Sequence, residues 1–278
     1  MCSSDLLAKA TGLYIGGTAL GGMAGRLLTA PVADAAGWRW AMAVAALFAI
    51  GCAVAVTAAL PASRNFVPRP RGGAELGAMA RVALADPALR SLYLLGACAV
   101  GTLVAVFNAL GFRLTSAPFH LSLGAISLLY LVYPLGTVSS TVSGALADRF
   151  GRRAVLPSGC ALAVLGVLLT MLPSLAAIVA GLAFLTAGFF VMHGLASGWV
   201  AVRAHLAGAS ASQAAAFYLC SYYVGSSVFG SLGGSAWSAY GWGGVGLLAL
   251  ALLACAGVAT ARLRRIPVLR GSALPALG

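Results

Sequence analysis

The chain has 278 residues, of which 61% are hydrophobic and only 8% are charged. A soluble globular domain carries about 25% charged residues, so this composition excludes a water-soluble protein and indicates an all-α integral membrane protein. The formal net charge of +12 does not indicate nucleic acid as a partner, because the arginines lie between apolar runs, where they orient helices in a bilayer.

Uncharged stretches long enough to cross a bilayer follow one another along the chain, since a spanning helix needs about 20 mainly apolar residues. The dipeptide Pro173–Ser174 divides the uncharged run 154–202, and the sequence SAYGWGG at 238–244 divides the run 204–261. The first expected span is interrupted only by Arg26. These divisions predict eight transmembrane helices, at residues 11–33, 40–60, 91–112, 121–147, 154–172, 174–201, 213–237 and 242–261.

The longest polar segment, residues 61–90, contains four prolines and five arginines. It is typical of a linker between two membrane bundles, with a short surface helix over 74–85. If the helices alternate across the membrane, fourteen of the 17 Lys and Arg residues fall on one side and two on the other, with Arg26 inside a span. The positive-inside rule then places the linker and both termini in the cytoplasm of a bacterial-type inner (plasma) membrane.

Residues 13–38 and 217–242 align without a gap at a constant offset of 204 positions. The aligned pairs include Tyr14 with Tyr218 and Trp38 with Trp242. We interpret the alignment as a repeat between two parallel six-helix halves, a plan found in secondary transporters, and expect this chain to lack the first four helices. The predicted organisation is the end of an N-terminal half at 1–60, a central cytoplasmic loop at 61–90, a complete C-terminal half at 91–265 and a cytoplasmic tail at 266–278.

The sequence GALADRFGRR, residues 144–153, joins the fourth and fifth predicted helices on the basic side. It resembles the signature loop of the major facilitator superfamily. The matching residues are Gly144, Leu146, Asp148, Arg149, Gly151, Arg152 and Arg153. The resemblance implies a transporter that moves a small solute by alternating access, with this loop between the second and third helices of a six-helix half.

Physical chemistry gives this loop two interpretations. Gly151 suits a positive φ in a tight turn, and Gly144 suits a close approach of two helices. In the first interpretation Asp148 is a conformational latch against the unpaired N–H groups where the first helix begins, near Ala10–Tyr14. In the second, the loop is a positive-inside hairpin with no further role.

The first helix is rich in glycine, and its small residues recur every four positions. This spacing predicts a close-packing helix face, formed by Gly12, Gly17, Gly21 and Gly25. The pattern partly resembles the antiporter signature of the superfamily's fifth helix. It departs from that signature at Arg26, Thr29 and Ala30, where proline and two glycines are wanted, so antiport is not inferred.

Arg26 is the one charge well inside a predicted span, where it needs a partner or a watery cavity. The readings left open are contact with an anionic substrate, a salt bridge to an acid outside this chain, and snorkelling to the interface. His193 is a second candidate, although a lone histidine in a helix more often packs. Candidate cavity-lining residues are Asn108, Tyr130, Tyr133, Tyr222 and Tyr223.

An enzyme embedded in the membrane is less favoured, because the chain has only five acids and none falls near the centre of a span. We expect no catalytic residues, no metal and no cofactor. The favoured function is secondary transport of a small solute, with efflux as one direction and any proton coupling through helices absent from this chain. The alternative is a truncated membrane remnant or accessory protein that does not transport.

Overall fold

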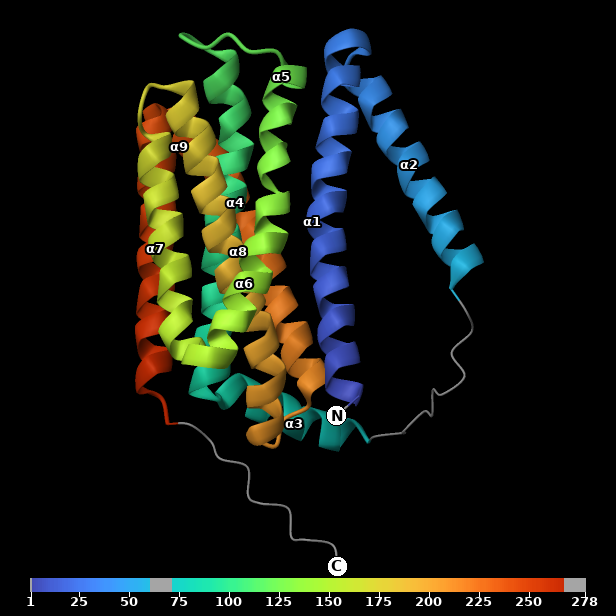
Figure 1. Ribbon diagram of the computed structural model, residues 1–278, viewed down its shortest axis with the longest axis vertical. Helices are drawn as coiled ribbons and strands as arrows, with labels where there is room; N and C mark the ends of the chain where they lie inside the picture. Colours follow the sequence, from blue (N-terminus) through green and yellow to red (C-terminus); the bar gives the residue numbers. More distant parts are fainter. Residues whose placement is uncertain (1, 61–71, 268–278) are drawn as a thin grey trace, which may run out of the picture.

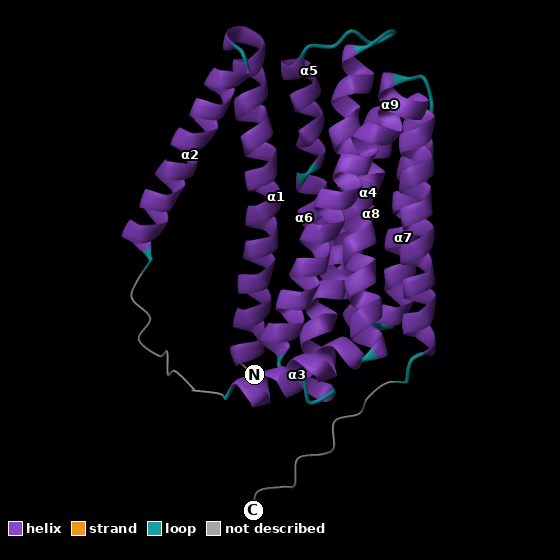
Figure 2. Ribbon diagram, turned by 180° about the vertical axis from the view of Figure 1, so that it is seen from behind, coloured by secondary structure: helices purple, strands orange, loops and turns teal. Residues whose placement is uncertain are grey.

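The computed structural model describes residues 2–60 and 72–267. Within these ranges the regular structure is helical throughout, with no strand (Figure 2). Figure 1 shows one group of long helices running roughly side by side, with α1 standing beside it and α2 leaning away. The molecule therefore consists of a helical bundle, α4 to α9, and a two-helix hairpin, α1 and α2, that touches the bundle along one side.

The hairpin is made of α1 (Cys2–Ala36) and α2 (Trp38–Ala59). Gly37 separates them with φ of 86°, a conformation that L side chains rarely adopt, so the chain reverses there. The first helix begins at Cys2, and the expectation that it starts near Ala10–Tyr14 is wrong. The free N–H groups of a helix start are therefore not found at Ala10–Tyr14.

The short helix α3 (Gly73–Ala85) lies across one end of the bundle, where it contacts α4 and α9. It confirms the surface helix predicted at 74–85, while the rest of the predicted linker, 61–71, lies outside the described residues. Asp86 follows α3 and caps the next helix by accepting hydrogen bonds from the backbone N–H groups of Ala88 and Leu89, both at 2.9 Å. Asp86 thus caps the end of α3 through its backbone N–H, which donates to the carbonyl of Val82, and the start of α4 through its carboxylate.

Helix α4 (Pro87–Thr115) is the most buried helix of the bundle, with 72% of its most apolar window buried. The next crossing of the bundle, called here the α5–α6 path, consists of three consecutive helical elements. They are α5 (Leu123–Ser127), the 3-10 turn η1 (Leu128–Val132) and α6 (Pro134–Phe150). The hydrogen-bonding pattern changes from 3-10 to α-helical at Pro134, which has no N–H to donate. The backbone N–H of the preceding residue, Tyr133, donates to the carbonyl of Tyr130 in the 3-10 pattern.

Helices α7 (Arg152–Thr170) and α8 (Leu175–Leu206) pack with their backbones nearly in contact. A Cβ added to Gly166 would lie 2.4 Å from the backbone nitrogen of Leu185, and one added to Gly188 would lie 2.5 Å from the carbonyl oxygen of Gly159. Only glycine fits at these crossings. The end of α7 is closed by buried Arg113 of α4, which donates to the carbonyl oxygens of Thr170 and Leu172.

The element α9 (Ala211–Arg265) contains two helical segments that meet at Gly241, where φ is 58° and ψ is −150°. A Cβ at Gly225 would meet Ala97 and one at Gly233 would meet Ala105, so the first segment runs parallel to α4. In the second segment Gly246 lies against Met171, at the end of α7, whereas the carbonyl of Arg264 accepts from Arg153, at the start of α7. That segment is therefore antiparallel to α7, and the chain reverses at Gly241.

Six helical stretches of the described residues are long and apolar enough to cross a membrane, namely α2, α4, the α5–α6 path, α7, α8 and α9. This agrees with an all-α membrane protein. The eight-helix count remains a prediction, because α9 counts once and α1 is not among the six. The segment 11–33 was expected to be a span, but it is rich in glycine and contains Arg26, so it is less apolar than the other segments.

Candidate functional site

A pocket of about 210 Å³ lies where α1 meets the bundle. Its walls come from α1, from the C-terminal third of α4 and from the α5–η1 segment. They are lined by Arg26, Thr29, Ala30, Phe107, Asn108, Gly111, Leu123, Ile126, Ser127 and Tyr130. Three of the candidate residues singled out in the sequence, Arg26, Asn108 and Tyr130, are thus brought together from three separate helical segments.

Arg26 is attached to one side of this pocket by Tyr130. Its Nη1 donates a hydrogen bond of 2.5 Å to the tyrosine hydroxyl, and its Cζ lies 4.5 Å from the centre of the same ring. Tyr130 is itself buried and packs against the rings of Phe107 and Tyr133, at centroid distances of 5.1 and 5.7 Å. An aromatic cluster of the bundle therefore positions the one charge that α1 contributes to the pocket.

A second contact between α1 and the bundle is made by Asp34, about two helical turns after Arg26. At about 1.5 Å per residue, the two positions are about 12 Å apart along the helix axis. Its carboxylate oxygens accept hydrogen bonds from the backbone N–H groups of Leu123, at 3.1 Å, and Gly124. These N–H groups begin the α5–η1–α6 path, where an acid is favoured by the helix dipole. Asp34 is thus already engaged and does not neutralise Arg26, and the pocket lining carries one positive charge and no acid.

The other polar side chains of the pocket differ in whether their hydrogen-bond donors already have a partner in the protein. Thr29 donates to the carbonyl of Gly25 and Ser127 donates to the carbonyl of Gly124, so both hydroxyl protons are used inside their own helices. Asn108 makes no hydrogen bond to the described residues. Its amide, the remaining N–H groups of Arg26 and the hydroxyl proton of Tyr130 are the donors that face this space.

His193 lies in a second cluster that is not part of this pocket. Its Nδ1 is 2.9 Å from the hydroxyl of Tyr218, and its ring is stacked with Phe189 and tilted against Tyr222, at centroid distances of 5.5 and 5.0 Å. Tyr223 points away from the bundle, with 61% of its surface exposed. The structure therefore does not bring His193, Tyr222 and Tyr223 to the pocket that contains Arg26.

The loop 144–153 forms a sharp turn between α6 and α7. Gly151 has φ of 86°, as its place in the motif predicts. A Cβ at Gly144 would meet nothing within 4 Å, so the expected close approach does not occur there. Leu146 is 41% exposed, and Asp148 is exposed with no partner among the described residues. Because α1 begins at Cys2, its free N–H groups do not lie at Ala10–Tyr14, and the latch role of Asp148 stays a prediction.

The arginines of this loop have different surroundings. Arg149 lies over the ring of its neighbour Phe150, with Cζ 5.1 Å from the ring centroid. Arg153 reaches the end of α9, where it donates to the carbonyl oxygens of Arg264, at 3.3 Å, and Ile266, at 2.6 Å. Arg152 is half-buried at the start of α7. Of the three, Arg153 therefore connects two helices of the bundle.

The glycine face predicted for α1 meets no neighbour among the described residues, and its packing role stays a prediction. A Cβ at Gly17, Gly21 or Gly25 would meet nothing within 4 Å. The surroundings of Gly12 are outside what the structure describes. Helix α1 contacts the bundle through the face that carries Arg26 and Asp34, and these glycines lie elsewhere on the helix.

Comparison with known proteins decides the family. The model of the Major Facilitator Superfamily matches residues 1–209. The chain belongs to the major facilitator superfamily. It is 39% identical over 217 residues to the inner membrane transport protein YnfM of Escherichia coli strain K12, covering 78% of this chain and 51% of that protein.

Two further relatives of this superfamily chain show the same pattern of coverage. It is 36% identical over 198 residues to the uncharacterized MFS-type transporter YybF of Bacillus subtilis strain 168, covering 71% of this chain and 49% of that one. It is 32% identical over 196 residues to an uncharacterized transporter of Buchnera aphidicola subsp. Baizongia pistaciae, covering 70% and 49%. This superfamily chain thus spans about half the length of the curated relatives it matches.

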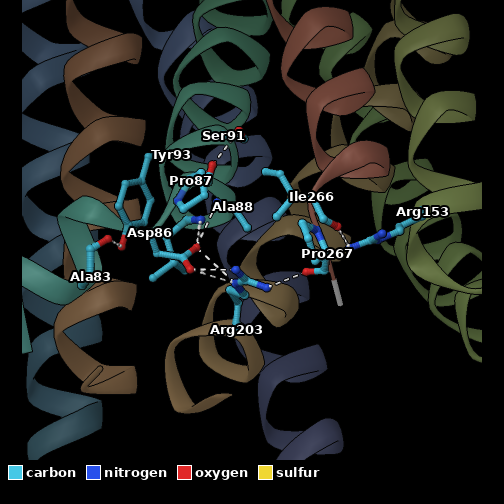
Figure 3. Close-up of polar contacts among 11 residues, drawn as sticks. Ala83, Asp86, Pro87, Ala88, Ser91, Tyr93, Arg153, Arg203, Ile266 and Pro267 are labelled. Atoms are coloured by element: carbon cyan, nitrogen blue, oxygen red, sulfur yellow. Dashed lines mark hydrogen bonds and ion pairs between the residues drawn. The ribbon is translucent and has the colours of Figure 1, made fainter. Parts of the chain in front are cut away.

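A buried ion pair, not singled out in the sequence, joins three helices at the basic side of this superfamily chain (Figure 3). The guanidinium of Arg203, in α8, donates to both carboxylate oxygens of Asp86, with its Nη2 2.8 Å from Oδ2. The two side chains are only 8% and 9% exposed. Arg203 also donates to the carbonyl of Pro267, just after α9, at 3.1 Å.

The protonation of Asp86 follows from these contacts. Burial raises the pKa of its carboxyl, but the hydrogen bond from Arg203, the backbone N–H groups of Leu89 and Ala88 and the charge of Arg203 together outweigh burial. The net result is a pKa below the ordinary value of 3.8. The sequence contained one signal for part of this arrangement, since Asp followed by Pro at the start of an apolar run is a helix N-cap pattern.

Proposed function

We propose that this chain belongs to a secondary transporter that moves a small solute by alternating access. The observation that carries the proposal is the pocket between α1 and the bundle, because it combines an arginine, an unpaired amide and an aromatic wall inside an apolar helical protein. Charged residues in such positions are costly and mark substrate or ion pathways. Superfamily membership and relatives named as transporters support transport in general.

The finer arrangement is part of the proposal. We infer that α1 and α2 close an N-terminal half and that α4 to α9 form a six-helix C-terminal half, with the basic side in the cytoplasm of a bacterial inner membrane. Solute then binds between the two halves, at the junction that contains Arg26. Any proton coupling rests on groups outside the pocket, whose lining contains no acid. An accessory membrane protein without transport is the alternative.

The chemistry of the pocket favours a small anionic solute. Arg26 supplies a charge that no acid of the lining neutralises, and Asn108 and Tyr130 add neutral donors. A carboxylate presents two oxygens that suit the guanidinium fork. The volume of about 210 Å³ limits the solute to a small molecule.

The proposal is tested by single cysteines placed in the pocket, at Asn108→Cys and Thr29→Cys, in a variant without native cysteines. Alternating access predicts that a membrane-impermeant maleimide labels each of them both in right-side-out and in inside-out vesicles. Thr186→Cys, fully buried in the bundle, and Val258→Cys, 53% exposed on an apolar helix face, are the controls and should stay unlabelled. Labelling of the pocket cysteines from one side only would contradict alternating access.

The same cysteines test the solute class. A small carboxylate should slow labelling at residue 108, while the uncharged amide of the same shape should not. Arg26→Gln should abolish the protection, and Arg39→Gln, an exposed arginine outside the pocket, should leave it intact. Equal protection by the acid and the amide would reject the anionic solute without rejecting transport.

A further inference from the structure

A second pocket, of about 610 Å³, lies at the basic side of the bundle between the start of α4 and the end of α9. Three arginines line it, Arg90 from α4 and Arg262 and Arg265 from the last turn of α9. All three are exposed, and none forms an ion pair or a side-chain hydrogen bond with the described part of the chain. The pocket therefore gathers three unneutralised positive charges from two helices distant in the sequence.

Nearby groups of opposite charge are already engaged. Asp86, next to Pro87 of the pocket wall, is paired with Arg203 and caps α4 (Figure 3). The carbonyl groups of Arg264, Ile266 and Pro267, at the negative end of α9, accept hydrogen bonds from Arg153 and Arg203. The arginines that line the pocket are thus left to an external anion.

Exposed aliphatic side chains lie on the membrane side of these arginines, Leu94 in the pocket wall and Val258 beside the pocket. Leu94 lies one turn further into the membrane than Arg90 and is 42% exposed. Val258 lies one turn before Arg262 on the same face of α9 and is 53% exposed. Both α4 and α9 therefore carry arginine at the helix end and an exposed aliphatic side chain one turn deeper in the membrane. This arrangement suits an amphipathic ligand that has an anionic head and an apolar tail.

We propose that this pocket binds the phosphate headgroup of an anionic phospholipid, with the acyl chains along Leu94 and Val258. Basic pockets between helix ends on the cytoplasmic side bind acidic lipid headgroups, and each nearby arginine contributes to the attraction. A free phosphate shares the headgroup chemistry but has nothing to place against the apolar wall. A zwitterionic lipid brings an ammonium group toward three arginines. Anionic phospholipid therefore fits the pocket best.

The test uses the purified 278-residue chain, titrated with phosphatidylglycerol or with phosphatidylcholine of the same acyl chains, and native mass spectrometry counts the lipid retained. We expect phosphatidylglycerol to be retained at about tenfold lower concentration than phosphatidylcholine. The variant with Arg90→Gln, Arg262→Gln and Arg265→Gln should lose this preference. The variant with lysine at the same three positions should keep most of it, because the positive charges remain.

A matched control removes three arginines from the same membrane side but outside the pocket, by Arg81→Gln, Arg149→Gln and Arg264→Gln. The control should keep the preference for phosphatidylglycerol. Equal loss in both glutamine variants, or no loss in the pocket variant, would overturn the proposal. Helix content by circular dichroism verifies that each variant is folded, and the lysine variant serves as the folded comparison if the glutamine variant is not.

A further arm distinguishes the two sources of phosphate. Inorganic phosphate is added to the chain carrying phosphatidylglycerol, at the same ionic strength as a chloride control. We expect the lipid to remain bound. Displacement of the lipid by phosphate but not by chloride, with the pocket variant insensitive, would assign the pocket to a soluble phosphate compound and overturn its assignment to a lipid.

Discussion

Helices α2 and α4 are both apolar enough to cross a membrane, yet only 6% of the most apolar 18-residue stretch of α2 is buried inside the structure, against 72% of that of α4. The two helices differ in burial because of how closely neighbouring helices pack against them, not because of their composition. A Cβ at Gly101 of α4 would lie 2.5 Å from the ring of Phe229, whereas one at Gly51 of α2 would meet nothing within 4 Å. Apolar composition places a helix in a bilayer, and close-fitting neighbours decide whether it packs.

The hairpin and the bundle also differ in the chemistry that holds them. Helices of the bundle interlock through glycines at their crossings and through the buried ion pair of Asp86 with Arg203. Helix α1 is held to the bundle by polar contacts at two positions along its length. Arg26 contacts Tyr130, and Asp34 contacts the start of α5. We therefore expect substitutions in the bundle to change its stability and substitutions in α1 to change mainly how α1 sits against it.

The largest effect is expected from Asp86→Asn, which leaves Arg203 buried without its counter-charge. Breaking a buried pair in this way costs about 3–5 kcal/mol of unfolding free energy. Because the pKa of Asp86 is lowered in the fold, its contribution is present above its unfolded value of about 3.8 and is lost as the pH falls through the lower folded value.

Thermal unfolding of the purified protein against pH measures this contribution. The difference between the original chain and Asp86→Asn should be full at about pH 6 and should shrink as the pH is lowered below about 4. Asp34→Asn is the control for removal of an acid elsewhere in the molecule. A difference that stays constant down to about pH 3 would show that the ion pair is not its source.

The second effect in size is expected from Gly166→Leu, at the crossing of α7 with α8. The leucine side chain would clash with the backbone of Leu185, because even a Cβ at this position would lie 2.4 Å from the backbone nitrogen of Leu185. Overpacking typically costs about 1–3 kcal/mol, and a backbone obstacle places this substitution at the upper end. Gly21→Leu, where a Cβ meets nothing within 4 Å, should leave the unfolding temperature unchanged. Equal losses would remove the contrast between hairpin and bundle.

The sequence predicted the helical class, the turns and the family well, and it predicted the packing poorly. The apolar runs located the helices, and the glycines of GW at 37–38 and of the loop at 151 marked chain reversals, because a positive φ is a local property. The glycine stripe of α1 meets no described neighbour and stays a prediction, whereas the close crossings at Gly166 and Gly188 are seen only in the structure. Spacing along one helix does not reveal which face a partner covers.

The candidate site was predicted in part for the same reason. Arg26 stood out because a charge within a span is costly, and Asn108 because it is polar in an apolar run. The contact of Arg26 with Tyr130 involves a residue of the 3-10 turn before Pro134, and periodicity does not indicate that turn. The pair Asp86–Arg203 joins residues 117 positions apart and has no sequence signal beyond the N-cap.

A smaller effect is expected from Asp34→Asn at the contact of α1 with α5. The asparagine still accepts a hydrogen bond but loses the charge that favours the start of a helix, a loss of about 1 kcal/mol at most. The bundle should keep its unfolding temperature, while the distance between spin labels at Ala33 and Ser122 should become broader. A lowered unfolding temperature with an unchanged distance would mean that α1 stabilises the bundle itself.

The smallest effect on stability is expected from Asp148→Asn, in the loop between α6 and α7. Asp148 is exposed and has no partner among the described residues, so its removal should change the unfolding free energy by less than about 0.5 kcal/mol. This separates Asp148 from Asp86, which lies on the same basic side but is buried and paired. A latch acts between conformations rather than on unfolding, so it needs a different measurement.

That measurement is the distance between spin labels at Leu20 of α1 and Ala154 of α7, which are both exposed positions. If Asp148 holds α1 and the bundle together in one conformation, Asp148→Asn should shift the populations of a two-peaked distance distribution several-fold, because about 1.4 kcal/mol is a factor of ten. Arg149→Gln, which changes the charge of the same loop without removing the acid, is the control. An unchanged distribution in Asp148→Asn would leave the loop as a positive-inside hairpin, whose arginines orient the helices and whose acid has no conformational role.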